Sequence, residues 1–388
     1  MTLSSTPSSQ PQAFDPARLD DFLRTQLPGL QGEMALQAIG GGQSNPTFFV
    51  SYGSRHMVLR KKPAGEVLPS AHAVDREYRV MKALAGTALP VPQMLLYHAD
   101  SDVVGTPFYL MEKVEGRVFN DNALAGMRPA ERRAIYLAMA DTLATLHAVD
   151  WRAAGLEGFG KEGGFFERQL HRWQKQWDLS RIAPNPAIDE LLAWLGANRP
   201  SDDETTLTHG DFKLNNLLFH PTEAKVVAVL DWELSTLGHP LADVAFNTVA
   251  WRTLPEEFGG LRGLDLAALG IPSESEYLAH FYQRAGRSDP ARQAAPFHWA
   301  FAFMRWAVIF EGIAARAARG NAVDDNASEV GAMAQALARR GLEVLIRDNQ
   351  RDDGLWVRAT DDAGAVLDPT PDLYDLAFVL FGLAAAHR

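Results

Sequence analysis

One short stretch of the chain holds residue types that could transfer a phosphoryl group. Asp211, Lys213 and Asn216 stand in the spacing D-x-K-x-x-N, and Asp231 follows directly behind the apolar run Val226–Leu230. A carboxylate can accept the proton of an attacking hydroxyl, and a lysine can offset charge on the transferring group. A carboxylate with an amide oxygen can hold Mg²⁺, which keeps several of its waters. The spacing predicts Asp211 and Lys213 as catalytic residues, and Asn216 and Asp231 as metal ligands.

The triplet that contains Asp211 has two other interpretations. His209-Gly210-Asp211 can form a turn, in which Gly210 permits the bend and Asp211 bonds to nearby backbone N–H groups. His209 and Asp211 also form an H-x-D pair of the kind that metallophosphoesterases use. The chain has no G-D-x-H-G or G-N-H-D stretch that would supply the remaining ligands of such a site. Phosphoryl transfer is favoured because it also accounts for Asn216 and Asp231.

The elements that must position these residues change in character along the chain. Residues 1–14 are mostly Ser, Pro and Gln, which predicts a disordered lead. Residues 15–115 are predicted to be β-rich, and residues 116–347 mainly helical. Together they predict an α+β fold with two lobes, a β-rich N-terminal lobe and a mainly helical C-terminal lobe. Residues 348–388 form an extension of unclear role.

Apolar periodicity and turn residues give the expected element boundaries. Strands are predicted at Ala35–Ile39, Thr47–Tyr52, His56–Arg60, Gln93–His98 and Pro107–Glu112, and short strands within Leu207–Phe219 and at Val226–Leu230. Helices are predicted at Pro16–Gln26, Ala71–Ala85, Pro129–Val149, Phe165–Leu179, Ala187–Ala197, Leu241–Ala250, Glu274–Ala285, Arg292–Arg319 and Ala327–Ile346.

Composition excludes several classes of function. The 388 residues carry a net charge of −11, which argues against a dedicated nucleic-acid binder. The absence of cysteine excludes disulfides, thiolate zinc sites, iron–sulfur clusters and cysteine nucleophiles. No stretch reaches the length of a membrane span, and the N-terminus lacks the pattern of a signal peptide. We therefore expect a cytoplasmic protein with no membrane or nucleic-acid partner.

The pattern H-G-D-x-x-x-x-N at His209–Asn216, followed by a hydrophobic strand that ends in Asp231, resembles a known superfamily. It is similar to the aminoglycoside phosphotransferase and choline-kinase-like proteins, which share the protein-kinase fold. The resemblance extends over roughly residues 30–345. It implies an ATP- and Mg²⁺-dependent kinase that acts on a hydroxyl of a small molecule. It also implies that residues 15–115 bind the nucleotide and that residues 116–347 carry the catalytic residues and bind the substrate.

The same resemblance implies where the nucleotide binds. It assigns this role to a glycine-containing loop, a cation–carboxylate pair and a hinge strand, at Gly41, Gly42, Ser44, Asn45, Arg60, Glu77, Glu112 and Val114. Taken singly, the glycines also fit a hairpin turn and Glu77 a surface carboxylate. Many kinases have Lys where Arg60 stands, so Lys61 or Lys62 is an alternative. Strand alternation places Lys62 on the face of Arg60 and Lys61 opposite, which makes Lys62 the second choice.

Other polar residues around the motif are expected to support it. Asp243, in Gly238-His-Pro-Leu-Ala-Asp243, resembles a residue that braces the catalytic loop in the family, and His209 is expected to organise that loop. Glu233 could contact a second Mg²⁺ or cap a turn. Arg305 lies in an apolar helix, so it needs a carboxylate partner or an anionic ligand. That helix, around Trp299–Ile309, is either packed core or the lining of an acyl tunnel.

A narrower resemblance concerns the substrate. Gly42–Thr47, Leu59–Pro63, Leu68–Tyr78 and Leu230–Gly238 are similar to the kinase-like domain that precedes an acyl-CoA dehydrogenase domain in some animal proteins. This resemblance implies a hydroxyacyl-CoA acceptor. The alternatives are a nucleotide-binding, pseudokinase-like regulatory protein and an aminoglycoside-type antibiotic kinase.

The last residues of the chain do not resemble the kinase family. Residues 348–388 faintly resemble a segment of N-acylglucosamine 2-epimerase-type sugar isomerases, but forty residues are too few to build that enzyme's helical barrel. We expect a loop and an apolar helix there, which either docks on the kinase lobe or pairs with another chain in an oligomer.

Overall fold

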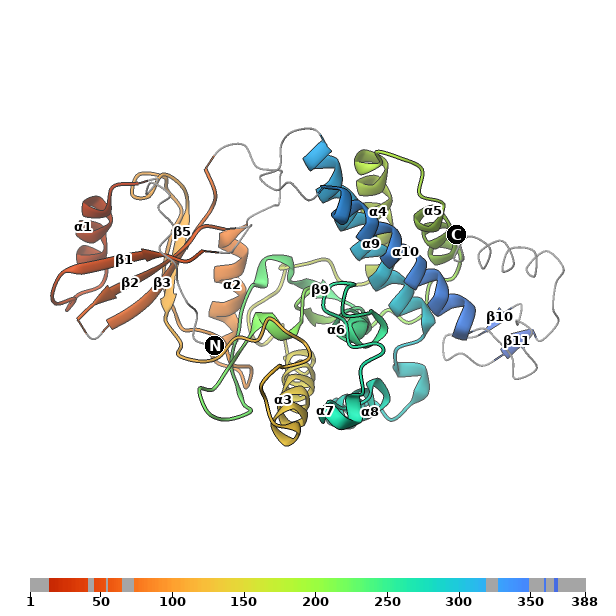
Figure 1. Ribbon diagram of the computed structural model, residues 1–388. Helices are drawn as coiled ribbons and strands as arrows, with labels where there is room; N and C mark the ends of the chain where they lie inside the picture. The colour runs from red at the N-terminus through yellow and green to blue at the C-terminus, as the bar shows by residue number, and fades with distance from the viewer. Residues whose placement is uncertain are drawn as a thin grey trace. The chain divides into compact units, whose positions relative to one another are not determined.

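The structure is a computed structural model that describes residues 14–40, 45–53, 55–64, 73–318, 327–348, 359–360 and 366–368. The chain divides into two compact units (Figure 1). Unit 1 comprises Met1–Asn120, Val149–Phe159 and Leu214–Thr236, and unit 2 comprises Asp121–Ala148, Gly160–Lys213 and Leu237–Arg388. The β-rich N-terminal region and the helical C-terminal region confirm the predicted α+β fold.

The sequence suggested two contiguous lobes, but unit 1 also takes in two later segments. Residues 214–236 belong to it because Phe219 exchanges backbone hydrogen bonds of 2.7 and 2.9 Å with Arg117, near the end of the first segment. Residues 149–159 belong to it because Arg76 donates to the Phe159 carbonyl at 2.8 Å and lies over the Phe159 ring. Both contacts join residues that lie far apart in the sequence, and no local sequence pattern indicates that they meet.

Unit 1 is built on a five-stranded antiparallel sheet. Its strands are β1 (Met34–Ala38), β2 (Thr47–Tyr52), β3 (Arg55–Lys61), β4 (Met94–His98) and β5 (Phe108–Glu112), in the order β1-β2-β3-β5-β4. Alternate residues of β2 are buried, as its apolar alternation requires. Helix α1 (Pro16–Gln26) packs Leu19 and Leu23 into the same core as Val50 and Leu59. Helix α2 (Val74–Leu84) and the hairpin of β7 (Leu217–Phe219) and β8 (Val226–Val229) complete the unit.

Unit 2 is mainly helical. Its helices are α3 (Pro129–His147), α4 (Phe165–Ser180), α5 (Pro186–Ala197), α6 (Pro240–Arg252), α7 (Leu266–Leu269), α8 (Glu274–Arg284), α9 (Pro296–Ala318) and α10 (Ala327–Asp348). Helix α9 is apolar on most sides because it packs against α4, α5, α6 and α10, and Figure 1 shows α9 and α10 side by side. Phe301, Phe303 and Met304 are buried in this core. A short pair of strands, β6 (Thr206–Thr208) and β9 (Thr236–Gly238), precedes the predicted catalytic loop and α6.

A few boundaries differ from the sequence-based expectation. Helix α9 begins at Pro296, not at Arg292, because Pro290–Arg292 forms a separate 3-10 turn capped by Asp289. Helix α7 and strand β9 were not expected, since both are too short to show a period. The expected loop and apolar helix of 348–388 lie outside the described residues, apart from the paired strands β10 (Ala359–Thr360) and β11 (Val366–Asp368).

No helix in the described part of the chain is long and apolar enough to cross a membrane. The residues 1–13, for which a disordered lead was predicted, lie outside that part.

A buried histidine in unit 2 predicts how stability depends on pH. His298 is 3% exposed, its Nδ1 accepts from the Ala295 N–H at 3.0 Å, and its ring stacks on His239. Burial, with the nearby His239 and Arg287, lowers the pKa of His298 from 6.5 to about 3. The folded state therefore holds the neutral form. The contribution of His298 to the free energy of unfolding is fully present above pH 6.5 and is lost as the pH falls toward 3. Between these values only the unfolded chain binds the proton, so the loss is about 1.4 kcal/mol for each pH unit.

We expect His298→Asn to weaken this pH dependence. Denaturant unfolding at pH 7 and pH 5 should show a smaller loss of stability in His298→Asn than in the wild type. His171→Asn removes an exposed histidine from α4 and should leave the loss unchanged. An equal loss in wild type and His298→Asn would show that the acid sensitivity arises elsewhere.

Candidate active site

The loop that carries Asp211 is held by a buried carboxylate. Asp243 lies in the first turn of α6 and accepts hydrogen bonds from the backbone N–H groups of His209 at 2.7 Å and Gly210 at 2.9 Å. Burial acts to raise the pKa of Asp243, but the hydrogen bond and charge of His147 and the contacts from His209 hold it below its usual value. Asp243 is thus an ionised brace that fixes the start of the loop, as expected.

The brace depends on a close approach at Gly238. A Cβ atom on Gly238 would lie 2.7 Å from the Phe165 ring and 2.9 Å from the Thr208 hydroxyl. Only glycine therefore lets β9 run into His239, whose Nδ1 accepts from the Leu241 N–H and caps α6. The position of Asp243 follows from this turn.

The two predicted catalytic side chains are paired. Lys213 Nζ lies 3.0 Å from a carboxylate oxygen of Asp211, whose side chain is 18% exposed. The Asp211 N–H donates to His209 Nδ1 at 3.2 Å, so His209 organises the loop from within. Both Asp211 and Lys213 belong to unit 2. The arrangement gives a partly accessible carboxylate beside a cation.

The two predicted metal ligands lie at one end of the β7–β8 hairpin in unit 1. Asn216 immediately precedes β7, and Asp231 is the second residue after the end of β8. The register pairs Leu217 with Val229, and the Leu230 N–H donates to the Asn216 carbonyl at 2.9 Å. Asp231 has φ of 64°, a left-handed conformation that Asp tolerates better than most residues. A carboxylate and an amide oxygen thus come from neighbouring backbone positions, a donor set that suits Mg²⁺.

The predicted cation–carboxylate pair forms in unit 1. Arg60 on β3 places Nε 3.3 Å from Glu77 Oε2 and Nη2 2.8 Å from Asp231 Oδ1. Burial opposes the charge of Arg60, yet the carboxylates around it raise its pKa. Burial likewise raises the pKa of Glu77 to about 7, against the lowering effect of Arg60. The guanidinium thus joins the α2 carboxylate to the predicted metal ligand.

The neighbouring lysines do not take this place. Lys61 is 3% exposed on the opposite face of β3, where its Nζ donates to the Val104 carbonyl at 2.6 Å. Lys62 follows the end of β3, and the described residues show no ion pair between it and Glu77. Arg60 is the cation that meets Glu77 in the described part of the chain.

Two further side chains support Glu77. Asn45 Nδ2 and the Tyr109 hydroxyl each donate to a Glu77 oxygen at 2.9 Å. Sequence reasoning assigned Asn45 to the nucleotide and missed Tyr109. The signal for Tyr109 is its register, since it pairs directly with Arg60 across β3 and β5. The predicted loop residues Gly41, Gly42 and Ser44 lie outside the described residues.

The predicted hinge follows β5. The Glu112 N–H donates to the Gln93 carbonyl at 2.9 Å, and Lys113 donates to the His56 carbonyl at 3.1 Å. The N–H of Glu112 is therefore used within the sheet, and no hydrogen bond of the Val114 amide is found among the described residues. An adenine at this segment would therefore have to use a main-chain group other than the Glu112 N–H, such as the Val114 amide.

The apolar helix α9 is packed core for most of its length. Trp299, Phe303 and Trp306 are buried against other helices. Arg305 donates from Nη2 to the Gly210 carbonyl, a backbone partner, whereas the sequence suggested a carboxylate or an anionic ligand.

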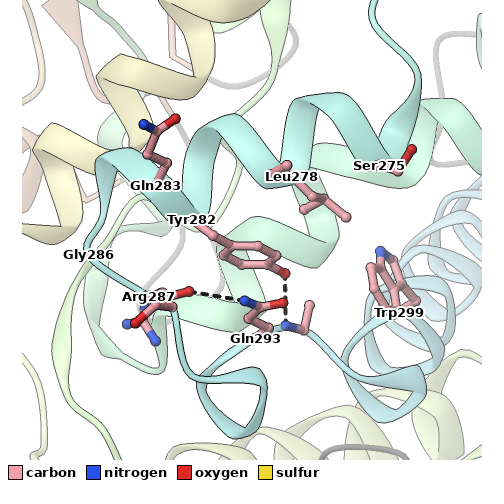
Figure 2. A pocket seen from close by; sticks show the side chains of 11 residues that line it. Ser275, Leu278, Tyr282, Gln283, Gly286, Arg287, Gln293 and Trp299 are labelled. Atoms are coloured by element: carbon pink, nitrogen blue, oxygen red, sulfur yellow. Dashed lines mark hydrogen bonds between the residues drawn. The ribbon is translucent and has the colours of Figure 1, made fainter.

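A cavity of about 710 Å³ opens between α8 and the start of α9 (Figure 2). Its lining includes Leu278, Tyr282, Gln293 and Trp299, and none of the predicted site residues. The Tyr282 hydroxyl accepts from the Ala294 N–H at 2.9 Å, and this bond is the dashed line that begins at the labelled Tyr282 in Figure 2. This cavity is separate from the loop that carries Asp211.

Two proteins of high sequence identity match most of this chain. Acyl-CoA dehydrogenase family member 10 of Mus musculus is 42% identical over 353 residues, which cover 89% of this chain and 33% of that protein. The chain thus spans about a third of the length of this curated relative. A solved structure from Ralstonia eutropha JMP134, named as an aminoglycoside phosphotransferase, is 43% identical with a TM-score of 0.77 and covers 85% of this chain and 98% of its own.

A more distant solved structure shares the fold. A thermostable mutant of aminoglycoside phosphotransferase APH(4)-Ia, solved with AMP-PNP and hygromycin B, is 20% identical with a TM-score of 0.52 and covers 83% of this chain and 98% of its own. Residues 35–279 match the phosphotransferase enzyme family over more than half of the chain. The fold, the braced Asp211 loop and these matches lead to one conclusion: the chain belongs to the phosphotransferase enzyme family.

Proposed function

We propose that this protein transfers the γ-phosphoryl group of ATP to a hydroxyl of a small molecule, with Mg²⁺. The observation that carries the proposal is Asp211, a partly accessible carboxylate on a loop braced by buried Asp243. The brace fixes the backbone beside Asp211, and a carboxylate that must orient a nucleophile needs such a fixed position. Family membership and the AMP-PNP complex of a relative with this fold support ATP as the donor.

In the proposed reaction, the acceptor oxygen forms a bond to the γ-phosphorus as the bond to the β–γ bridging oxygen of ATP breaks. The hydroxyl proton passes to Asp211, and ADP leaves with the electron pair of the broken bond. Lys213, 3.0 Å from Asp211, offsets negative charge on the transferring group. Asp211 thereby orients the nucleophile and accepts its proton.

The residues of unit 1 are proposed to hold the nucleotide. Asn216 and Asp231 would bind Mg²⁺, which neutralises phosphate charge when bound. Arg60, fixed by Glu77 and Asp231, would contact the α- and β-phosphates. Gly41, Gly42, Ser44 and Asn45 would approach the phosphates, and the main chain at Glu112 and Val114 would bind the adenine.

The charges near Asp211 favour a neutral or anionic acceptor over a polycationic antibiotic. Lys213 lies against Asp211, and Arg305 is close enough for the Asp211 carboxylate to favour its charged form. Arg172 adds a third positive charge, which acts on Arg305. A polycation that approached Asp211 would meet these cations.

We infer that the acceptor is a hydroxyacyl-CoA, for which 4-hydroxyacyl-CoA is the first probe. The curated relatives are longer proteins named as acyl-CoA dehydrogenase family members, and one segment of each is similar to this chain. The pantetheine arm separates the CoA phosphates from the acyl hydroxyl, so with the hydroxyl at Asp211 those phosphates would meet surface Lys or Arg groups away from Asp211. Binding energy from the CoA part would also help to hold the hydroxyl in position for attack.

We expect the CoA ester to be a much better substrate than the free hydroxy acid. ADP release should be measured with 4-hydroxyacyl-CoA, with the free 4-hydroxy acid, and with the acyl-CoA that lacks the hydroxyl as the matched control. The hydroxylated ester alone should give rapid release. Equal rates for ester and free acid, or none for either, would contradict the hydroxyacyl-CoA assignment.

A further inference from the structure

The backbone on each side of Asp211 is held by side chains that lie far from the motif in sequence. On one side, Arg305 of α9 donates from Nη2 to the carbonyl of Gly210. On the other side, Asn247 of α6 donates from Nδ2 to the carbonyl of Phe212 at 3.2 Å. The residues that directly precede and follow Asp211 are thus both anchored through their carbonyl groups.

The anchor at Gly210 is a cation inside a largely apolar region. The Arg305 guanidinium lies 4.8 Å from the centre of the Phe246 ring and 5.8 Å from that of Trp173. Burial lowers the pKa of Arg305, while the charges of Asp211 and Asp243 favour its charged form. A leucine or methionine would fill the same space without the cost of burying a charge. The hydrogen bond to the loop is what the arginine adds.

The anchor at Phe212 is itself held by a third helix. Asn247 Oδ1 accepts from the Tyr277 hydroxyl of α8 at 2.6 Å, and both side chains are buried. This bond fixes the orientation of the amide, so that Nδ2 faces the Phe212 carbonyl. Asn247 lies one turn after Asp243 on α6, so a single helix face contacts the loop on both sides of Asp211.

We propose that Arg305, and Tyr277 acting through Asn247, are positioning residues that set the place of the Asp211 carboxylate for proton transfer. The proposal rests on the proposed kinase function. In this proposal, neither Arg305 nor Tyr277 contacts the substrate. Each acts on the backbone beside Asp211, where a displacement of about 1 Å can cost on the order of 100-fold in rate.

The effect should appear in kcat and not in nucleotide binding. Arg305→Met should lower kcat by about 10- to 100-fold while KM for MgATP changes little, because the nucleotide residues lie elsewhere in the chain. Arg305→Lys should recover part of the loss, since an ammonium can still donate to Gly210. Tyr277→Phe, which removes only the hydroxyl, should lower kcat by a smaller factor in the same direction.

Two variants serve as matched controls. Arg316→Met makes the same change at an exposed position of α9. Tyr282→Phe removes a buried hydroxyl from α8, where that hydroxyl accepts from Ala294 at the cavity of Figure 2. Both controls should keep wild-type kcat. A loss of kcat in the controls equal to that in Arg305→Met and Tyr277→Phe would overturn the proposal, because any damage to these helices would then suffice.

Amide hydrogen exchange of the peptide 207–218 tests the anchoring without any assay of activity. Arg305→Met and Tyr277→Phe should speed exchange at the amides of residues 209–213 in this peptide, while exchange in the five-stranded sheet of unit 1 stays at the wild-type rate. Unchanged exchange in the loop would overturn the proposal even if kcat falls. If the wild type phosphorylates no acceptor, the proposed function fails, and the exchange experiment still decides whether these residues fix the loop.

Discussion

Replacing Asp211 with Asn is expected to lower kcat by about 10²–10⁴-fold while MgATP binding stays nearly unchanged. Asparagine keeps the size of the side chain but cannot accept the proton of the acceptor hydroxyl. The Asp243 brace contacts the backbone of His209 and Gly210, so the loop should keep its place in the variant. Steady-state kinetics give kcat, and calorimetric titration with MgATP gives the affinity.

Asp178→Asn is the matched control, since it makes the same change on the exposed side of α4 in the same unit. It should leave both kcat and MgATP affinity at their wild-type values. An Asp211→Asn protein with wild-type turnover would remove Asp211 from the mechanism.

Replacing Asp231 with Ala is expected to weaken MgATP binding by at least about ten-fold, because even the loss of an outer partner of a metal ligand costs roughly 10–100-fold in metal affinity. The variant also removes the carboxylate 2.8 Å from Arg60. Titration with ATP at increasing Mg²⁺ separates the two effects. Affinity measured without Mg²⁺ reports the loss at Arg60, and the gain on adding Mg²⁺ reports the metal site.

The control for Asp231→Ala is Asp100→Ala. Asp100 lies with His98 and Asp102 in an exposed acidic group of unit 1 that contains none of the predicted ligands. Its removal should leave the Mg²⁺-dependent gain in ATP affinity intact. If Asp231→Ala also kept that gain, Asn216 and Glu233 would have to be the ligands.

Much of the fold follows from local pattern. The boundaries Pro16–Gln26 and Thr47–Tyr52 were predicted as they are observed, because a proline start, an apolar face and strict alternation are properties of the segment itself. The pairing of Arg60 with Glu77 was expected from the family resemblance, because a single carboxylate on a helix by itself fits the surface equally well. In the structure Glu77 falls on the buried side of α2 with Val74, Met81 and Leu84.

The remaining contacts have no local signature. Arg305 and Gly210 are 95 residues apart, and Asn247 and Phe212 are 35 apart, each joined by one hydrogen bond to a backbone oxygen. Any residue supplies such an oxygen, so the loop sequence cannot indicate which helix will reach it. The return of residues 214–236 to unit 1 likewise depends on backbone bonds between Arg117 and Phe219, which no side-chain pattern encodes.

The central claim is phosphoryl transfer to a small-molecule hydroxyl, and the most direct test is detection of the phosphorylated product. The chain should be incubated with ATP, Mg²⁺ and a set of hydroxylated metabolites that includes 4-hydroxyacyl-CoA, and product and ADP quantified together by mass spectrometry. We expect one hydroxylated acceptor to gain phosphate in equal amount to the ADP formed, and no product with Asp211→Asn. ATP binding without a phosphorylated product from any acceptor would contradict the claim and favour a nucleotide-binding regulatory protein.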